Sequence, residues 1–343
     1  MANMIRFRKN RISIPIILCI SFMISMFILP LYADAYVAGD ISRKKNTSLP
    51  PLTGELQKSI MDSTPVEAAG SDLELVCPAA RLSTARIPQG YTYDGNSYYY
   101  LSQMATGSDD LRLTRITWQG NGTYQSSYMT LKNFGHGTNL DCVRVNGKTW
   151  LWTGCNSKKG ESTAITRFTF KSGKVLNRHG KGLYRIPLSK KSKKYATNVY
   201  PAIDAKGKKL AVRYTDGKKQ YFVFYRLIGG KKIRTRKYYK KVALKKKAAP
   251  FQGFDINGTT LYTIEGTASK SEMRERKEKY YPIVIRKYDY AKKKKQQIKV
   301  KGASRLSHRE PEGIQVQSKG SILMNLASHY KTRYTCVNVY RLK

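Results

Sequence analysis

One strand-like pattern recurs five times along this chain, and its period limits the folds that the chain can adopt. The pattern places an arginine between large aromatic or aliphatic residues: LTRITW at Arg115, ITRFTF at Arg167, FYRLIG at Arg226, VIRKYD at Arg286 and VYRLK at Arg341. Successive arginines are 52, 59, 60 and 55 residues apart. A period of this length, with several short strands in each repeat, is typical of the blades of a β-propeller or of a similar repeat array.

A hairpin-like segment precedes each arginine pattern. Each segment is a short strand, a turn and a second strand, and the five begin at Tyr91, Val143, Ile203, Phe254 and Ile314. Dipeptides such as Asn146-Gly147 and Asp216-Gly217 are strong hairpin signals. Because an isolated strand pair cannot bury both of its faces, the five units must stack on one another. We therefore expect an all-β, five-bladed β-propeller, with a β-sandwich of similar hairpins as the alternative.

The two ends of the repeat region fit a closed ring. The last unit stops at Lys343, directly after its third strand, so that blade needs a fourth strand from elsewhere. The segment Leu73–Val76 (LELV) precedes the first full repeat and can supply it. Closure of this kind removes exposed sheet edges. We assign residues 71–343 to the propeller domain, with the ring closed by an N-terminal strand.

The N-terminus has the features of an export signal. A basic start with Arg6, Arg8, Lys9 and Arg11 precedes the apolar run 12–31 and a small-residue site, Ala33-Asp34-Ala35. This order predicts a signal peptide, residues 1–35, that is cleaved before Tyr36. The apolar run is also long enough to span a bilayer, so an uncleaved anchor is the alternative. Residues 36–70 lack periodicity and are rich in Pro, Ser, Thr and Gly, which predicts a flexible linker. We expect a secreted, extracellular protein that can associate with the cell wall.

Four cysteines remain after the predicted cleavage removes Cys19. In an exported chain an even number favours disulfide bonds. The blade arrangement suggests two pairs, Cys142–Cys155 around one hairpin and Cys77–Cys336 across the ring closure, with four free thiols as the alternative. The spacing of Cys and His does not match a zinc site, so we predict no metal and no cofactor.

The positive charge of the chain is concentrated in its second part. The formal net charge is +42, and residues from Asn156 onward hold 49 Lys and Arg against 11 Asp and Glu, a net charge of +38. Such a field attracts polyanions. The predicted polyanion-binding residues are Lys190, Lys191, Lys193, Lys194, Lys240, Lys241, Lys245, Lys246, Lys247, Lys292, Lys293, Lys294 and Lys295.

The predicted export decides which polyanion is expected. Outside a Gram-positive cell the abundant polyanions are wall glycopolymers, such as teichoic acids, and anionic membrane surfaces. We expect one of these as the partner of a monomeric protein, and no physiological nucleic acid. A solvated surface that only keeps the protein soluble is the alternative.

Several stretches of the chain resemble a known family. They are NFGHGTNLD from Asn133, LWTGC from Leu151, YPAID from Tyr200, QGFDINGTTLYTIEG from Gln252 and HREPEGIQV from His308. These stretches are similar to helveticin J-type class III bacteriocins and to the propeller domain shared by TagC-like proteins and staphylococcal phage receptor-binding proteins. The resemblance covers roughly Arg81 to Lys343 and implies a five-bladed propeller. It implies killing of related bacteria in the bacteriocin branch and binding to wall glycopolymer in the phage branch.

A ring of polar residues is expected at the mouth of the central channel. Aligning the hairpins on their turns places Gln89, Asp141, Pro201, Gln252 and Glu312 at equivalent positions, and the adjoining loops carry His136, His308 and Glu310. Such a ring can bind a cation or a sugar. The alternative, which we favour at this stage, is that these groups bond the backbone of neighbouring blades and fix their geometry.

No catalytic motif is present, and Glu310 and Glu312 are too close in sequence to form a convincing opposed carboxylate pair. We therefore expect no enzyme. The favoured function is a secreted antibacterial protein that binds anionic envelope polymers of competing Gram-positive bacteria and kills them. A non-lethal wall glycopolymer-binding or adhesin-like propeller is the first alternative, and a glycan hydrolase is the second.

Overall fold

The architecture is given by a computed structural model, which describes residues 71–84, 86–119, 124–178, 183–189, 194–304, 306, 308–330 and 334–343. The predicted signal peptide and linker lie outside these residues. Three of the predicted anion-binding lysines, Lys190, Lys191 and Lys193, lie outside them too. In the described part of the chain, no helix is long and apolar enough to cross a membrane.

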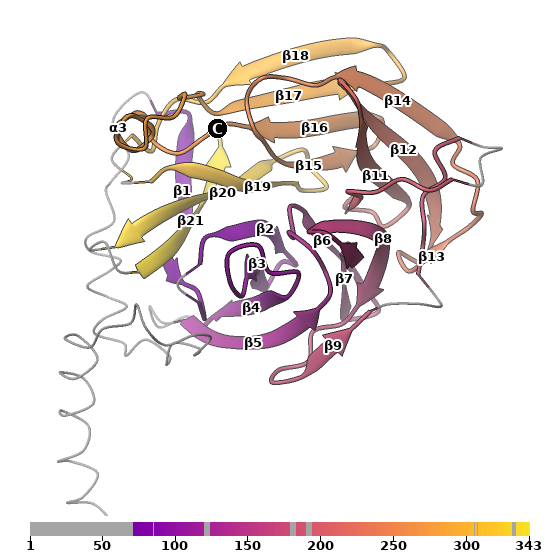
Figure 1. The fold of residues 1–343 in the computed structure, drawn as a ribbon, viewed down its shortest axis with the longest axis horizontal. Helices are drawn as coiled ribbons and strands as arrows, with labels where there is room; N and C mark the ends of the chain where they lie inside the picture. The colour runs from indigo at the N-terminus through magenta and orange to yellow at the C-terminus, as the bar shows by residue number, and fades with distance from the viewer. Residues whose placement is uncertain are drawn as a thin grey trace, which may run out of the picture. The chain divides into compact units, whose positions relative to one another are not determined.

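Five antiparallel sheets follow one another around a ring, so the prediction of a five-bladed β-propeller is confirmed (Figure 1). The innermost strands are β2 (Pro88–Tyr93), β6 (Leu140–Val145), β10 (Tyr200–Ile203), β15 (Phe251–Asn257) and β19 (Glu310–Val316). Each of these five strands contacts the innermost strands of both neighbouring sheets. We number the sheets as blades 1 to 5 in this order.

The remaining strands run outward from the axis in each blade. The second strands are β3 (Ser97–Gln103), β7 (Lys148–Lys158), β11 (Lys209–Asp216), β16 (Thr260–Glu265) and β20 (Ile322–Tyr330). The third strands are β4 (Leu111–Trp118), β8 (Glu161–Phe168), β12 (Lys219–Ile228), β17 (Val284–Asp289) and β21 (Tyr334–Leu342). The outer strands of blades 1, 3 and 4 are β5 (Tyr124–Lys132), β14 (Lys240–Lys245) and β18 (Lys294–Lys299).

Three short elements complete the fold. The strand β9 (Val175–Asn177) follows blade 2 in sequence but pairs in parallel with β5 of blade 1. The strand β13 (Lys232–Ile233) pairs with the end of β12. The helix α3 (Lys270–Glu275) lies in the loop between β16 and β17 and is capped by Ser269, whose hydroxyl accepts a hydrogen bond from the N–H of Glu272.

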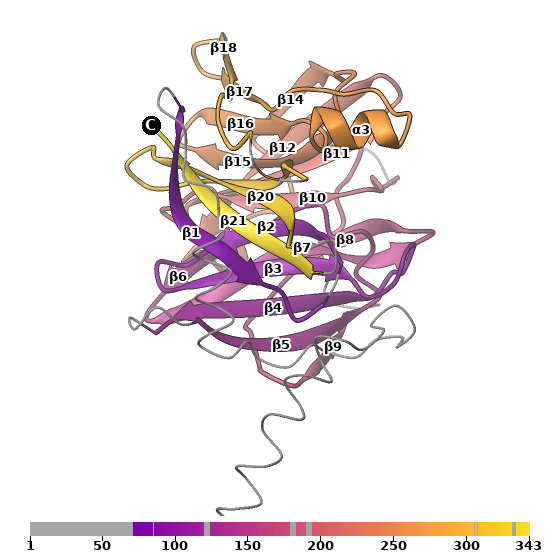
Figure 2. The same ribbon diagram turned by 90° about the vertical axis from the view of Figure 1, so that its left-hand side faces the viewer.

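The N-terminal strand closes the ring, as the sequence predicts. The strand β1 (Leu73–Arg81) pairs antiparallel with β21 and becomes the fourth strand of blade 5 (Figure 2). Leu73 lies opposite Leu342, and the strand extends beyond the predicted segment to Arg81. Pairing with β1 provides hydrogen-bond partners for the N–H and C=O groups along the edge of β21, which would otherwise be unpaired.

An apolar cluster fills each of the five interfaces between neighbouring blades. Each second strand packs one of its faces against each of the two neighbouring blades. In β11, Leu210 and Val212 pack toward blade 2, whereas Ala211 packs toward blade 4. Blades buried on both faces explain why these strands are nearly continuous hydrophobic runs. Burial of each large side chain contributes roughly 1.5–3 kcal/mol, so stacking the blades supplies most of the stability.

The repeated arginines occupy equivalent positions in the third strands. The guanidinium groups of Arg115, Arg167 and Arg226 lie over the rings of aromatic residues: Phe170 at 4.5 Å, Trp150 at 4.9 Å and Tyr239 at 5.7 Å from the ring centres. Arg286 pairs with Glu265, and Arg341 pairs with Glu74 across the ring closure. The pattern therefore marks a scaffold position that covers neighbouring side chains.

The predicted Cys142–Cys155 disulfide is wrong, because both residues are buried free thiols. Cys142 lies opposite Leu151 in the β6–β7 ladder. Cys155 is therefore four residues further along β7, roughly 13 Å at the rise of a strand. A disulfide requires Cα atoms within about 7 Å.

The predicted Cys77–Cys336 disulfide is wrong for a similar reason. Two irregularities in the β1–β21 ladder place Cys77 opposite Val339 and Cys336 opposite Arg81. Cys77 is a buried free thiol that donates to the hydroxyl oxygen of Tyr124 at 3.4 Å. Burial raises the pKa of the Cys77 thiol to about 12, which keeps it protonated and unreactive.

Candidate functional site

Polar side chains of the innermost strands join neighbouring blades at the centre of the ring. One carboxylate oxygen of Asp141 accepts the backbone N–H of Ile203 at 2.6 Å, and the other accepts that of Cys142 at 2.7 Å. Because Asp141 lies on β6 and Ile203 on β10, the bond from Ile203 connects blades 2 and 3, whereas the bond from Cys142 lies within β6. Asp141, one of the predicted channel-mouth residues, is therefore buried within the ring.

Two residues that the sequence analysis missed make similar connections. The amide of Asn139 donates to the carbonyl of Pro201 at 2.8 Å and accepts the N–H of Phe254 at 3.1 Å. It therefore connects blade 2 to blades 3 and 4. The side chain of Gln315, on β19, both donates to and accepts from the backbone of Tyr93 and so connects blades 5 and 1.

The carboxyl group of Asp141 interacts with that of Asp255, a third residue that the sequence analysis missed. Asp255 also accepts the N–H of Val316 at 2.5 Å and so connects blades 4 and 5. Burial raises the pKa of Asp141 to about 7. Burial and then the Asp141 charge raise the pKa of Asp255 well above its ordinary value. The pair therefore holds a proton at the centre of the ring.

A second group of polar side chains lies where β19 enters the ring. We call it the histidine cluster: His308, Glu310, Glu312 and, from α3, Glu272. Ring nitrogen Nδ1 of His308 lies 2.5 Å from Glu272 Oε2, and Nε2 lies 2.9 Å from Glu310 Oε2. Burial lowers the pKa of His308, but Glu310 and Glu272 raise it by more, so the net shift is upward.

Of the remaining predicted channel-mouth residues, Gln252 contacts this group. Gln252, on β15, donates to Glu310 Oε1 at 3.0 Å and to the carbonyl of Gly266 at 3.2 Å. Gln89 is half-buried at a bulge in β2, and Pro201 is buried in β10. His136 is exposed in the loop between β5 and β6 and is not a member of the histidine cluster. The structure thus brings together Gln252, His308, Glu310 and Glu312.

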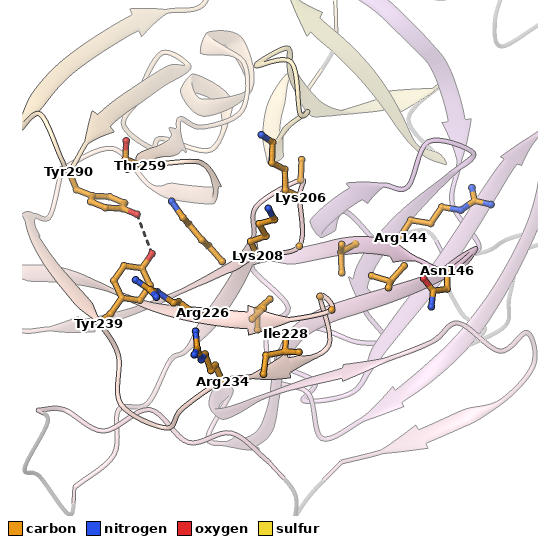
Figure 3. A pocket seen from close by; sticks show the side chains of 18 residues that line it. Arg144, Asn146, Lys206, Lys208, Arg226, Ile228, Arg234, Tyr239, Thr259 and Tyr290 are labelled. Atoms are coloured by element: carbon orange, nitrogen blue, oxygen red, sulfur yellow. Dashed lines mark hydrogen bonds between the residues drawn. The ribbon is translucent and has the colours of Figure 1, made fainter.

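A large basic cleft opens beside the turns that follow the innermost strands of blades 2, 3 and 4. Its volume is about 1060 Å³ (Figure 3). Its cationic side chains come from blades 2 and 3: Arg144, Lys206, Lys208, Lys209, Arg226 and Arg234. None of the described residues that line the cleft is acidic. The cleft therefore concentrates positive potential between low-dielectric walls, which attracts anions.

Local backbone bonds shape the floor and wall of this cleft. The buried carboxylate of Asp204 accepts the backbone N–H groups of Lys208 and Lys209, both at 2.7 Å, which fixes the turn that carries the lysines. Gly230 has a φ of 65° and lies so near blade 2 that a Cβ atom would stand 2.9 Å from a methyl group of Val145. Only glycine allows the blade 3 turn to approach this closely.

Two tyrosines form one end of the basic cleft, across from Arg144 and Asn146 (Figure 3). The hydroxyl groups of Tyr239 and Tyr290 lie 3.3 Å apart. Tyr239 is 40% exposed, so its ring presents an apolar face to the cleft beside the cations. Aromatic faces together with a few placed polar groups are typical of ligand sites.

The described lysines of the predicted polyanion set lie mainly on the outer rim. Lys240, Lys241 and Lys245 lie on β14, and Lys294 and Lys295 lie on β18. Lys246, Lys247, Lys292 and Lys293 are exposed in the adjoining segments, and Lys194 is exposed before β10.

Three of the rim lysines converge on a second, smaller opening. Lys245, Lys247 and Lys295 line a groove of about 270 Å³ between blades 3 and 4. Arg286 and Lys287, which the prediction omitted, line it as well. The cations of the larger basic cleft were all missed. The AKGKK turn of the third hairpin was the available signal for them, because it places basic residues directly after an innermost strand.

The fold and these surfaces define the protein as a five-bladed β-propeller with a basic cleft beside its ring. The family of the phage five-bladed β-propeller receptor-binding platform domain matches residues 89–328. This match covers more than half of the chain, and the chain therefore belongs to that family.

Two relatives show the extent of the similarity. The chain is 27% identical over 252 residues to the putative major teichoic acid biosynthesis protein C of Bacillus subtilis (strain 168), covering 68% of this chain and 53% of that protein. It is similar in fold to the tail fiber of Staphylococcus aureus phage P68, with a TM-score of 0.57 and 19% identity, over 83% of this chain and 55% of that chain. The chain spans about half the length of both relatives. These matches support the phage and TagC-like branches of the predicted resemblance, while the helveticin branch stays a prediction.

Proposed function

We propose that this protein is a non-lethal binding module for anionic, phosphate-bearing glycopolymers of a bacterial cell surface, and that the basic cleft is its binding site. The observation that carries the proposal is the cleft itself, with six cations, two tyrosines and no acid among its described lining residues. Membership of a receptor-binding platform family supports a binding role. The name of the Bacillus relative supports teichoic acid as the polymer class.

The dimensions and chemistry of the basic cleft suit a polymer of alternating sugars and phosphates. Its volume of about 1060 Å³ is at the upper end of the roughly 300–1,000 Å³ that ligand sites occupy, so it can hold more than one repeat unit. An exposed ion pair contributes only about 0.2–1 kcal/mol. Six cations contacting successive phosphates therefore supply a few kcal/mol, and the sugar faces can pack on the exposed ring of Tyr239. The modest energy of each contact makes a repeating ligand the best fit.

The proposed polymer partner indicates where the protein acts. A wall polymer is outside the cell, which agrees with the export signal predicted for residues 1–35. We propose that the protein acts extracellularly, free or associated with the wall, and that the rim lysines add diffuse attraction to the same polymer.

The test is binding of the full chain to purified wall teichoic acid at low and high salt. Binding should weaken steeply as salt rises, because exposed charges are screened. Reversing two exposed cleft charges in Lys206→Glu/Lys208→Glu should weaken binding by about tenfold or more, since 1.4 kcal/mol corresponds to a factor of ten.

Two matched variants distinguish binding in the cleft from a general effect of the net charge of the protein. Lys292→Glu/Lys293→Glu makes the same charge change at the exposed turn before β18, and Lys245→Glu/Lys247→Glu makes it in the rim groove. Equal losses in all three variants would refute the cleft as the site and leave a diffuse polyanion surface. Salt-insensitive binding, or equal binding to a neutral glycan such as dextran, would refute the electrostatic account.

Killing of bacteria stays a separate prediction from the sequence. Neither the matched family nor the two relatives described above has killing in its name. Viable counts of Gram-positive strains exposed to the protein would decide it. Strain-selective killing would restore the bacteriocin reading, and binding without killing would agree with the proposed module.

A further inference from the structure

The histidine cluster differs from the basic cleft in charge and in place. The cleft adjoins turns that follow the innermost strands, whereas the cluster lies where the innermost strand β19 begins. Three carboxyl groups surround one imidazole in a chain whose formal net charge is +42. This concentration of acids is not explained by polymer binding, and the following inference does not depend on the proposed function.

His308 is held in an orientation that suits a metal ligand. Its side chain is only 1% exposed. Nδ1 faces the Glu272 carboxylate at 2.5 Å, so the N–H at this position has an acceptor and fixes the ring. A histidine that binds a metal through one nitrogen usually donates the other N–H to a carboxylate or carbonyl. This contact leaves Nε2 to face the two carboxyl groups on β19.

Glu310 is positioned by a neighbouring blade. Its Oε1 accepts a hydrogen bond from the Gln252 amide of blade 4 at 3.0 Å, while its Oε2 lies 2.9 Å from His308 Nε2. The Gln252 amide is itself fixed by the carbonyl of Gly266. One carboxylate oxygen is thus directed toward the imidazole nitrogen that a cation would share.

Glu312 provides the observation that points to a missing positive partner. The residue is 3% exposed, and none of the hydrogen bonds of the described residues reaches its carboxyl group. It lies at a bulge in β19, between Pro311 and Ile314, and one of its carboxyl oxygens lies within 4.8 Å of ligand atoms of His308 and Glu310. A buried carboxyl without a partner is costly, and the ionisable side chains of His308 and Glu310 lie close to this one.

The three potential ligand atoms are close enough to share one ion. Atoms of His308, Glu310 and Glu312 all lie within 4.8 Å of one another. Zinc ligands stand about 2.0–2.2 Å from the metal, so small rotations of the glutamates bring the three groups into one coordination sphere. One imidazole with two carboxylates suits Zn²⁺ or Mn²⁺, since Ca²⁺ and Mg²⁺ select oxygen ligands.

We propose that His308 Nε2, Glu310 and Glu312 bind a divalent transition-metal cation, Zn²⁺ or Mn²⁺, at the entrance of β19. Glu272 is a positioning residue that holds the imidazole through Nδ1. Binding replaces the His308–Glu310 contact and gives Glu312 its missing partner. The ion then links β19 to α3 and, through Gln252, to blade 4.

The experiment is calorimetric titration of the EDTA-dialysed full chain with ZnCl2 and, separately, with MnCl2, with thermal unfolding measured in parallel. We expect one site per chain and a higher Tm in the presence of the metal. If Zn²⁺ and Mn²⁺ both bind with one site per chain, binding to cysteine is excluded, because Mn²⁺ prefers nitrogen and oxygen ligands.

Four variants locate the site. Glu312→Gln and Glu310→Gln should each weaken binding by at least about tenfold, and Glu272→Gln should weaken it by roughly 10- to 100-fold, as for other groups that orient a ligand. Glu278→Gln makes the same charge change in the same loop at a side chain that is 49% exposed, and it should bind like the unmodified chain.

Two results would overturn the proposal. One is a folded, unmodified chain that takes up neither metal at about 1 mM, a level that corresponds to only weak binding. The other is equal affinity in the unmodified chain and in a folded Glu312→Gln or Glu310→Gln chain. Because the Glu310 side chain is 21% exposed, whereas Glu312 is 3% exposed, the Glu310 variant keeps the test valid even if Glu312→Gln does not fold.

Discussion

The carboxyl pair Asp141–Asp255 should make the stability of the ring depend on pH in an unusual direction. Most carboxylates in proteins stabilise the folded state when ionised. Here burial raises the pKa of Asp141 from 3.8 to about 7, so the folded chain binds the proton more tightly than the unfolded chain. The contribution of this group is complete below about pH 4 and is lost as the pH rises through 7. One pKa unit corresponds to about 1.36 kcal/mol, so the loss is on the order of 4 kcal/mol.

The informative substitution is Asp255→Asn. It removes one charge of the pair and lets an amide N–H donate to Asp141. It also leaves one backbone N–H of Ile256 or Val316 facing the new amide nitrogen, because Asp255 accepts from both. We expect a cost of about 1–3 kcal/mol at low pH from that unpaired group, together with a smaller loss of stability as the pH rises.

Chemical denaturation at several values from about pH 4 to pH 8 measures both effects. The free energy of unfolding of the unmodified chain should fall more steeply than that of Asp255→Asn, because the variant keeps the buried Asp141 carboxyl but lacks the second carboxyl whose pKa burial raises. Glu74→Gln, at an exposed ion pair with Arg341, controls for the loss of one negative charge. Parallel pH curves for the unmodified chain and Asp255→Asn would show that the pair does not share a proton.

Three further predictions concern the ring itself. Leu73→Ala should lower the free energy of unfolding by about 2–5 kcal/mol, measured by denaturation, because Leu73 is fully buried in the closing strand; a change below 1 kcal/mol would mean that the closure contributes little. Gly313→Ala should destabilise the fold by about 1–3 kcal/mol, since Gly313 has a φ of 142° and a Cβ atom would lie 3.1 Å from that of Tyr91. Gly320→Ala is its control, with a φ of 86° but open space around it. Finally, a reducing agent should leave the Tm unchanged, because Cys77, Cys142 and Cys155 are free thiols; a clear drop would indicate a disulfide.

The repeat predicted the fold well because its most regular residues are scaffold. Arg115 and its four equivalents occupy third strands, where each blade imposes the same environment, so their spacing counts the blades directly. The closing strand was also predictable, since the fifth unit is one strand short. The register of the paired strands could not be predicted from the sequence. It depends on details such as the irregularities on either side of Cys77, and offsets of three or four residues in the ladders separate cysteines that appear paired in the sequence.

The candidate sites were predicted only where sequence neighbours also lie together in space. His308, Glu310 and Glu312 belong to one short segment and were found together. Their partner Glu272 comes from a long loop whose path no periodicity determines. The basic cleft was missed because its cations are spread from Arg144 to Arg234 and converge only when blades 2 and 3 pack. Runs of lysine attracted the prediction instead, and these lie mostly on outer strands.

The antiparallel pairing of β1 with β21 also determines how the ring responds to mechanical load. Leu73 and Leu342 lie opposite each other at one end of the ladder, and the backbone N–H of Lys343 donates to the carbonyl of Asp72 at 2.9 Å. Tension applied through Ser71 and Lys343 therefore peels the two strands apart one hydrogen bond at a time, whereas shear would load all of the bonds together. If the basic cleft binds a polymer as proposed, a pull through that polymer is carried by blades 2 and 3 and loads this seam much less. The ring should therefore resist force applied at the basic cleft better than force applied between Ser71 and Lys343.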